Sequence, residues 1–320
     1  MKLLTKLILV FFSLIIVSCT DSSQQADPDF KPQNTVKHFS SDNSPVVLVD
    51  EAHNNFLTIS GRYKPFEQVL SSNGFTVKSN TKRFTLDILK NIDILVIVNA
   101  LDHSRRDWQP PFGSALNDDE VASVKQWVTD GGSLLLIADH TPFPKVVENL
   151  AFAFGFEFSN GHVGRYTFRI VDATLSADHP ITNRGNNSSN EVPVALSIPN
   201  TQKNASLSSR ITQVKTFGGS AFKAPDEAES LLTIRQGIFS TEPAIPFQVN
   251  SSTTRIPIEG WSQGAVLKFG KGRVAVFSEG MMFSSQLDVK TGEKHGLRSV
   301  GAEQNEQFLL NVMHWLSSVF

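Results

Sequence analysis

Polar side chains that could carry out chemistry stand at the ends of four apolar runs in the sequence. They are Asp50, His53 and Asn54 after "PVVLV", His103 after "DILVIVNA", Asp139 and His140 after "GSLLLIA", and Glu279 after "RVAVFS". Carboxylates, amides and imidazoles can hydrogen-bond the hydroxyls of a polar ligand, coordinate a divalent metal ion or transfer protons. If the four runs are neighbouring strands of one sheet, these groups meet at one edge and form a single site.

The first three runs are unbroken and aliphatic, which is typical of parallel strands that are covered on both faces. Helical patterns lie between them: "RYKPFEQVLSSNGF" stops at an Asn-Gly pair, and "NDDEVASVKQWVTDGG" has an acidic first turn and a Gly-Gly end. The alternation predicts an α/β fold with a flavodoxin-like parallel sheet and helices on both faces. In that fold, ligands bind beyond the carboxyl ends of the strands.

The second half of the chain has a different pattern. Residues 161–259 contain short alternating segments and turn-rich connectors, which predict a β-rich insertion. "GAVLKFGKGRVAVFSEG" then predicts a hairpin, and "NEQFLLNVMHWLSSVF" a closing amphipathic helix. If the second hairpin strand joins the sheet in parallel, Glu279 reaches the same rim, and we expect Phe143 and Phe283 to be exposed there.

The N-terminal residues 1–19 have the pattern of a secretory signal. Their apolar run, residues 7–17, is about 11 residues long, whereas a membrane-spanning helix needs roughly 20. The end of this segment, "IVSC", resembles a bacterial lipobox, which implies that Cys19 is lipidated and anchors the protein to a membrane. Residues 20–43 are polar and contain two prolines, and we expect them to form a flexible tether before the folded part, residues 44–320.

Composition excludes several functions. Cys19 is the only cysteine, so the chain has no internal disulfide and no second thiolate for a metal or for catalysis. The formal net charge is −2 and no basic run stands out, so we expect no nucleic-acid partner.

Several stretches together resemble the class I glutamine amidotransferase-like superfamily. They are "VVLVDEAHNN", "DILVIVNA", "DDEVASVKQWVTDGGSLLLIAD", "DHPIT" and "GKGRVAVFSEGMMFS" with "NEQFLLNVMHWLS". The similarity runs from Val46 onward and points to an uncharacterised branch carried on bacterial lipoproteins. The active enzymes place a cysteine nucleophile where this chain has Asp139 and His140, so the resemblance implies the fold but excludes glutamine hydrolysis by a thiolate.

Three other chemistries remain open. A divalent metal could be held by Asp50, His53, Asp139 and His140, although no HExxH spacing supports one and the alternative is a protein without a cofactor. A serine hydrolase would use Ser278 or Ser284, but there is no GxSxG motif. Acid-base hydrolysis would use Glu279 and His140 as catalytic residues, or Glu279 paired with Asp50.

From these observations we expect a lipid-anchored protein of a Gram-negative cell envelope. Thr20 follows the lipobox cysteine where inner-membrane retention would place an aspartate, which favours the outer membrane, with the protein facing the periplasm. The expected activity is binding of a small polar ligand or carbohydrate at the rim. The binding residues would be Asp50, His53, Asn54, His103, Asp139, His140 and Glu279. The alternatives are a metal- or carboxylate-dependent hydrolase and an accessory partner of an envelope transport system.

Overall fold

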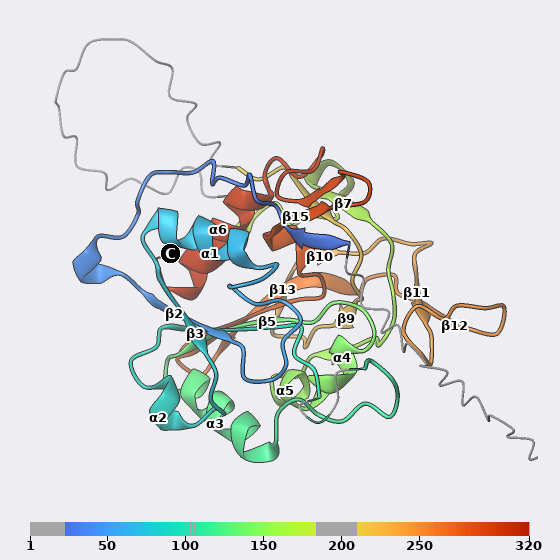
Figure 1. The fold of residues 1–320 in the computed structure, drawn as a ribbon, viewed down its shortest axis with the longest axis horizontal. Coiled ribbons are helices and arrows are strands. Elements are labelled where there is room, and N and C mark those ends of the chain that lie inside the picture. The colour runs from blue at the N-terminus through green and yellow to red at the C-terminus, as the bar shows by residue number, and fades with distance from the viewer. Residues whose placement is uncertain (1–22, 103, 105–106, 184–209, 320) are drawn as a thin grey trace, which may run out of the picture.

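The apolar runs form adjacent parallel strands in the computed structural model, which describes residues 23–102, 104, 107–183 and 210–319 (Figure 1). The three strands of the first half are β2 (Val46–Asp50), β4 (Ile94–Val98) and β5 (Ser133–Ile137). Every residue of β4 and β5 is buried, as expected for strands covered on both faces.

These strands belong to a nine-stranded mixed sheet in the order β3-β2-β4-β5-β14-β13-β9-β6, with β10 beside β13. The other members are β3 (Thr76–Asn80), β6 (Glu157–Phe158), β9 (Phe222–Lys223), β10 (Glu229–Thr233), β13 (Ser262–Phe269) and β14 (Gly272–Phe277). The first five strands are parallel and follow the flavodoxin-like order, so the predicted fold class is confirmed. β13 and β14 form the predicted hairpin, and β14 pairs with β5 in parallel.

Helices cover both faces of the sheet, as Figure 1 shows. One face packs against α1 (Lys64–Asn73) and α6 (Asn305–Leu316), and the other against α2 (Leu86–Leu89), α3 (Asp118–Thr129), α4 (Phe143–Val146) and α5 (Glu148–Ala153). α1 ends at Gly74, whose φ of 102° is a left-handed conformation that glycine adopts without strain. α3 begins with a capping box between Asn117 and Glu120.

The β-rich section forms two further ribbons and also widens the main sheet. β7 (Tyr166–Arg169) pairs with β8 (Gln213–Thr216), and β11 (Phe239–Glu242) pairs with β12 (Thr254–Pro257). A short 3-10 helix, η2 (Ile170–Asp172), follows β7. Through β9 and β10 this section adds strands beside β13, so its hydrophobic core is continuous with that of the parallel sheet.

A third small sheet corrects the expected flexible tether. β1 (Gln24–Ala26) pairs antiparallel with β15 (Ser285–Asp288), which in turn pairs with β16 (Lys294–Gly296). Two 3-10 helices lie nearby in the sequence: η1 (Ser41–Asn43) precedes β2, and η3 (Met281–Phe283) precedes β15. Phe30 is buried in the main core. The described part of the expected tether therefore lies against the domain, because its few apolar and hydrogen-bonding groups find partners that the sequence pattern does not reveal.

Two predicted residues, Cys19 and His103, lie outside the described part of the chain. Among the described residues, no helix has the length and hydropathy needed to span a bilayer.

Candidate functional site

The end of β2 carries a buried hydrogen-bond network around His53. Its Nδ1 lies 2.8 Å from Asp50 Oδ2, and its Nε2 lies 2.9 Å from Glu120 Oε1 at the first turn of α3. The Nδ2 group of Asn55 donates to Asp50 over 3.0 Å, and the backbone N–H of Phe84 donates to Glu120 over 3.1 Å. All three charged side chains are at most 2% exposed, so this network ties loops together inside the domain.

The carboxylates determine the charge of His53. Burial by itself lowers the pKa of His53, but the hydrogen bonds and negative charges of Asp50 and Glu120 outweigh it and raise that pKa above the ordinary 6.5. Burial likewise opposes the ionised form of Glu120, but hydrogen bonds from Asn117 and His53 lower its pKa. The geometry fits an imidazolium that donates from both ring nitrogens, which leaves neither nitrogen for a ligand or metal ion.

Asp139 and Glu279 lie at the ends of the neighbouring strands β5 and β14. The Nδ2 group of Asn99 donates to Asp139 Oδ2 over 3.3 Å, and the backbone N–H of Gly280 donates to the same oxygen over 3.4 Å. Glu279 is buried and accepts the backbone N–H groups of Met281 and Met282, each over 2.9 Å. The predicted approach of the β5 and β14 ends is therefore present.

The carboxyl group of Glu279 is electrostatically unusual. Burial, and then the negative charge of Asp139, raise its pKa well above the ordinary 4.5, against the lowering effect of the backbone hydrogen bonds. The same two carboxyl groups, after burial, also raise the pKa of Tyr63, whose hydroxyl donates to the Gly280 carbonyl over 2.9 Å. A carboxyl whose pKa is raised holds its proton to a higher pH than an exposed one, which is a property of general acids.

An aromatic patch lies beside Asp139; it consists of Trp108, His140, His162 and Phe247. The rings of His140 and His162 stack with centroids 4.7 Å apart, and those of Trp108 and Phe247 stack at 5.9 Å. His140 also meets Phe247 edge-on at 5.0 Å. Phe247 is 57% exposed, so the patch is open to solvent. Four separate segments of the chain contribute to it.

The charge state of His162 depends on its neighbours in the patch. Burial and the adjacent His140 lower its pKa below 6.5, while Asp139 acts in the opposite direction. His140 bonds through Nδ1 to the Thr141 carbonyl over 2.8 Å, which fixes the orientation of its ring. His162 also has a hydrogen bond to the Val163 backbone, which leaves one nitrogen of the neutral ring as an acceptor for a ligand hydroxyl.

The structure divides the predicted site residues into two groups. Asp50 and His53 belong to the buried network. His140 is part of the aromatic patch and Asp139 lies beside it, whereas Glu279 is buried next to Asp139. Among the described side chains no hydrogen bond joins the two groups directly. Asn54, with a positive φ of 49°, donates to the Asp102 carbonyl over 3.3 Å.

The expectation that Phe143 and Phe283 are exposed is wrong. They are 1% and 0% exposed, because Phe143 packs under Trp108 and Phe283 stacks with Phe308 of α6. Phe247 and Trp108 supply the accessible aromatic surface instead.

Sequence reasoning missed Glu120 and three members of the aromatic patch, Trp108, His162 and Phe247. The Asn117-x-x-Glu120 spacing is a capping-box signal that could have placed Glu120 at the start of a helix, but not beside His53. His162 and Phe247 lie in loop segments and carry no comparable signal.

The hypothesised metal and serine sites receive no geometric support. No group of three or more His, Cys, Asp or Glu side chains within the described ranges is arranged to hold a metal ion. Ser278 and Ser284 are fully buried, and their hydroxyls donate to the carbonyls of Ser220 and Arg62 over 2.8 and 2.5 Å. Their protons are thus committed to backbone acceptors.

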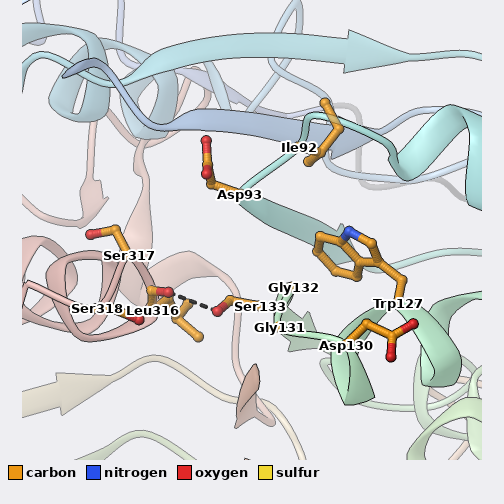
Figure 2. A pocket seen from close by; sticks show the side chains of 10 residues that line it. All are labelled: Ile92, Asp93, Trp127, Asp130, Gly131, Gly132, Ser133, Leu316, Ser317 and Ser318. Carbon is orange, nitrogen blue, oxygen red and sulfur yellow. Dashed lines mark hydrogen bonds between the residues drawn. The ribbon is translucent and has the colours of Figure 1, made fainter. Parts of the chain in front are cut away.

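A pocket lies at the amino-terminal ends of β4 and β5, at the opposite end of these strands from Asp139 (Figure 2). Asp93, Trp127, Asp130, Ser133 and the end of α6 line it. Ser133 Oγ donates to the Leu316 carbonyl over 2.7 Å, the dashed line in Figure 2, and Asp93 accepts the Val46 N–H over 2.7 Å. These contacts join the amino-terminal ends of β2 and β5 to neighbouring segments of the chain.

Comparison with known proteins defines the fold only. No family model matches the chain, and no curated protein matches it. Among solved structures, the chain is similar to the N-terminal domain of mmIFT52, with a TM-score of 0.52 and 12% identity over 85% of this chain and 97% of that one. At that identity the likeness shows a shared fold and nothing about activity.

Two weaker similarities are to bacterial and archaeal proteins. A protein described as ThuA-like from Bacteroides uniformis ATCC 8492 matches with a TM-score of 0.42 and 12% identity over 85% of this chain and 92% of that one. A Thermoplasma acidophilum protein described as part of a GMP synthase matches with a TM-score of 0.41 and 12% identity over 87% of this chain and 96% of that one.

Proposed function

We propose that this protein is a lipid-anchored envelope protein that binds a small hydroxylated ligand, of the carbohydrate class, at the aromatic patch. The observation that carries the proposal is the exposed Phe247 stacked on Trp108 beside the His140–His162 pair and Asp139. A sugar ring has apolar faces that pack on aromatic rings, and hydroxyls that hydrogen-bond imidazole and carboxylate groups. The patch offers both kinds of surface side by side.

The cellular setting of the proposal rests on the N-terminal sequence. We propose that residues 1–19 form a lipoprotein signal, that Cys19 is lipidated, and that the protein faces the periplasm from the outer membrane. We also propose that it belongs to a branch of the amidotransferase-like superfamily that lacks the cysteine nucleophile. The flavodoxin-like strand order and Asp139 at the end of β5 support that assignment.

The binding proposal is tested with the soluble body, beginning at Thr20, on an array of glycans and cell-wall fragments, followed by calorimetry on the strongest hit. Phe247→Ala removes stacking surface, and we expect it to weaken binding about tenfold. Phe239→Ala is the matched control, because Phe239 is also exposed, at 41%. Phe239 belongs to β11 and lies against Arg255 of β12, outside the patch. Absence of any hit, or an equal loss in both variants, would contradict the proposal.

A second candidate, a carboxylate-dependent hydrolase, is favoured by the raised pKa of Glu279 beside Asp139. In this function Glu279 would donate a proton to the leaving group, and Asp139 would activate water. Turnover of the bound glycan that disappears in Glu279→Gln, while binding persists, would establish it. Binding without turnover in the unmodified protein would exclude it for that ligand.

A further inference from the structure

The chain is fixed to the domain from Ser23 onward, close to Cys19 in the sequence. The backbone N–H of Val289 donates to the Ser23 carbonyl over 2.8 Å, and Ser23 Oγ donates to Asp288 Oδ2 over 3.1 Å. β1 then pairs with β15 in a register that sets Gln24 opposite Asp288. Ser23 is only 4% exposed. We call residues 23–34 the N-terminal strap.

Side-chain contacts hold the rest of the strap. Asp27 is 4% exposed and lies 3.0 Å from Lys294 Nζ on β16. Phe30 is buried beneath the Arg298 guanidinium, 4.6 Å from its ring centroid. Glu306 at the start of α6 accepts the backbone N–H groups of residues 33 and 34 over 2.7 and 2.8 Å. A strap with this many buried contacts remains attached to the folded domain.

This attachment limits the distance between the domain and a lipid on Cys19. Only residues 20–22 separate Cys19 from Ser23, and four extended residue steps reach about 14 Å. We propose that the turn between β15 and β16, residues 289–293, lies against the lipid surface, so that the domain is held in a set orientation. This inference rests on the proposed lipidation of Cys19.

The turn carries an exposed valine and lysine that suit a lipid headgroup layer, and its one carboxylate, Glu293, pairs with Arg165 over 3.2 Å. Val289 contacts Ser23, the first residue of the strap, and its side chain is 53% exposed. The exposed Lys290 follows it. An aliphatic side chain can enter the headgroup boundary, and a lysine is attracted to anionic lipids. The turn also lies close in the chain to Glu279, because η3 and β15 follow that residue directly. Figure 1 shows β1 and β15 side by side.

The test uses the full-length protein, purified from a Gram-negative host and reconstituted in vesicles of phosphatidylethanolamine and phosphatidylglycerol. Lipidation consumes the Cys19 thiol, so Lys290→Cys provides the one free thiol for a fluorophore. Lys271→Cys is the matched control, because Lys271 is an exposed lysine in the β13–β14 turn, at the opposite end of β14 from Glu279. Nitroxide-headgroup lipids then quench fluorophores that lie near the bilayer.

We expect quenching at position 290 and none at position 271. A flexible Gly/Ser linker of about 20 residues, inserted between Thr20 and Asp21, should abolish the quenching at 290 while the protein stays on the vesicles. Equal quenching at both positions, or none at either, in vesicle-bound protein would overturn the orientation but leave the anchor intact. If position 290 is shielded from solvent in native membranes but not in pure lipid vesicles, the turn contacts a protein partner. That result would also overturn the proposed contact with the lipid surface. Mass spectrometry that finds Cys19 unmodified would refute the anchor itself.

Discussion

His53 Nε2 lies 2.9 Å from Glu120 Oε1, which joins the end of β2 to the first turn of α3 across 67 positions of sequence. The other ring nitrogen contacts Asp50, so one imidazole bridges two buried carboxylates. This bridge positions the loop that carries Asn54 and Phe56 next to the strand end of β4, where the Phe56 N–H bonds the Asn99 carbonyl over 2.9 Å. The histidine therefore fixes the position of the loop that follows β2 at the carboxyl end of the sheet.

Removal of one member of this bridge should destabilise the whole domain. Glu120→Ala leaves a buried imidazolium with one carboxylate, and we expect a loss of about 3–5 kcal/mol in the free energy of unfolding by urea. Asp118→Ala is the matched control, because Asp118 is an exposed acid in the same helical turn, and its loss should cost about 0.3–1 kcal/mol. Similar losses in the two variants would contradict a bridging role.

The bridge also predicts how stability depends on pH. The pKa of His53 is raised in the folded state, so its contribution is fully present below its ordinary pKa of 6.5 and is lost as the pH rises through the folded value. The pKa of Glu120 is lowered, so its contribution is present above its ordinary 4.5 and is lost as the pH falls through the folded value. We expect the difference in unfolding free energy between the unmodified protein and His53→Gln to shrink on the alkaline side. A difference that does not change with pH would show that His53 is not charged in the fold.

His162 should titrate below 6.5, and its neighbours should shift it in opposite directions. Burial is the larger cause, and the adjacent His140 adds to it, so His140→Gln should raise the pKa of His162. Asp139→Asn removes the opposing negative charge and should lower that pKa further. NMR titration of the imidazole C–H signals measures both shifts. Shifts of the same sign in both variants would mean that the ring stack and Asp139 are not arranged as described.

The N-terminal strap should contribute to stability although it precedes the sheet. Phe30→Ala removes a side chain that is 4% exposed, and we expect a loss of about 3–5 kcal/mol. Val36 is 68% exposed, so Val36→Ala should change stability by less than about 0.5 kcal/mol. Thermal or urea unfolding distinguishes the two, and a flexible tether would make both substitutions neutral.

Gly219 lies so close to Ser278 and Glu279 that a larger residue there should displace them. A Cβ atom at Gly219 would lie 2.0 Å from the Ser278 carbonyl oxygen and 2.9 Å from Glu279 Cβ, so Gly219→Ala must displace that loop. Gly260 has a similar positive φ, 77° against 84°, but no atom within 4 Å of the added Cβ. Gly260→Ala should therefore cost only the backbone strain, about 1–2 kcal/mol. A larger loss of stability in Gly219→Ala is the expected result, and equal losses would contradict the close approach.

Local patterns in the sequence were sufficient for most of the sheet and its helices. The aliphatic runs predicted β2, β4 and β5 because strands covered on both faces need continuous apolar residues, and the Gly270–Gly272 turn predicted the β13–β14 hairpin. The acidic start of α3 and the Asn73-Gly74 stop of α1 are signals that act within one helical turn. These elements depend on neighbouring residues, so the sequence by itself determined them.

Contacts between distant segments were decided only by the tertiary structure. Whether Asp50 and His53 face a ligand or Glu120 depends on how α3 crosses the sheet, and the aromatic patch gathers residues 108, 140, 162 and 247 through loop conformations. The polar N-terminal segment resembles a tether by composition, yet it lies against the domain because β1 pairs with the edge of β15 and Phe30 packs in the hydrophobic core. Composition reports the average tendency of a segment, whereas its actual environment is set by partners far away in the chain.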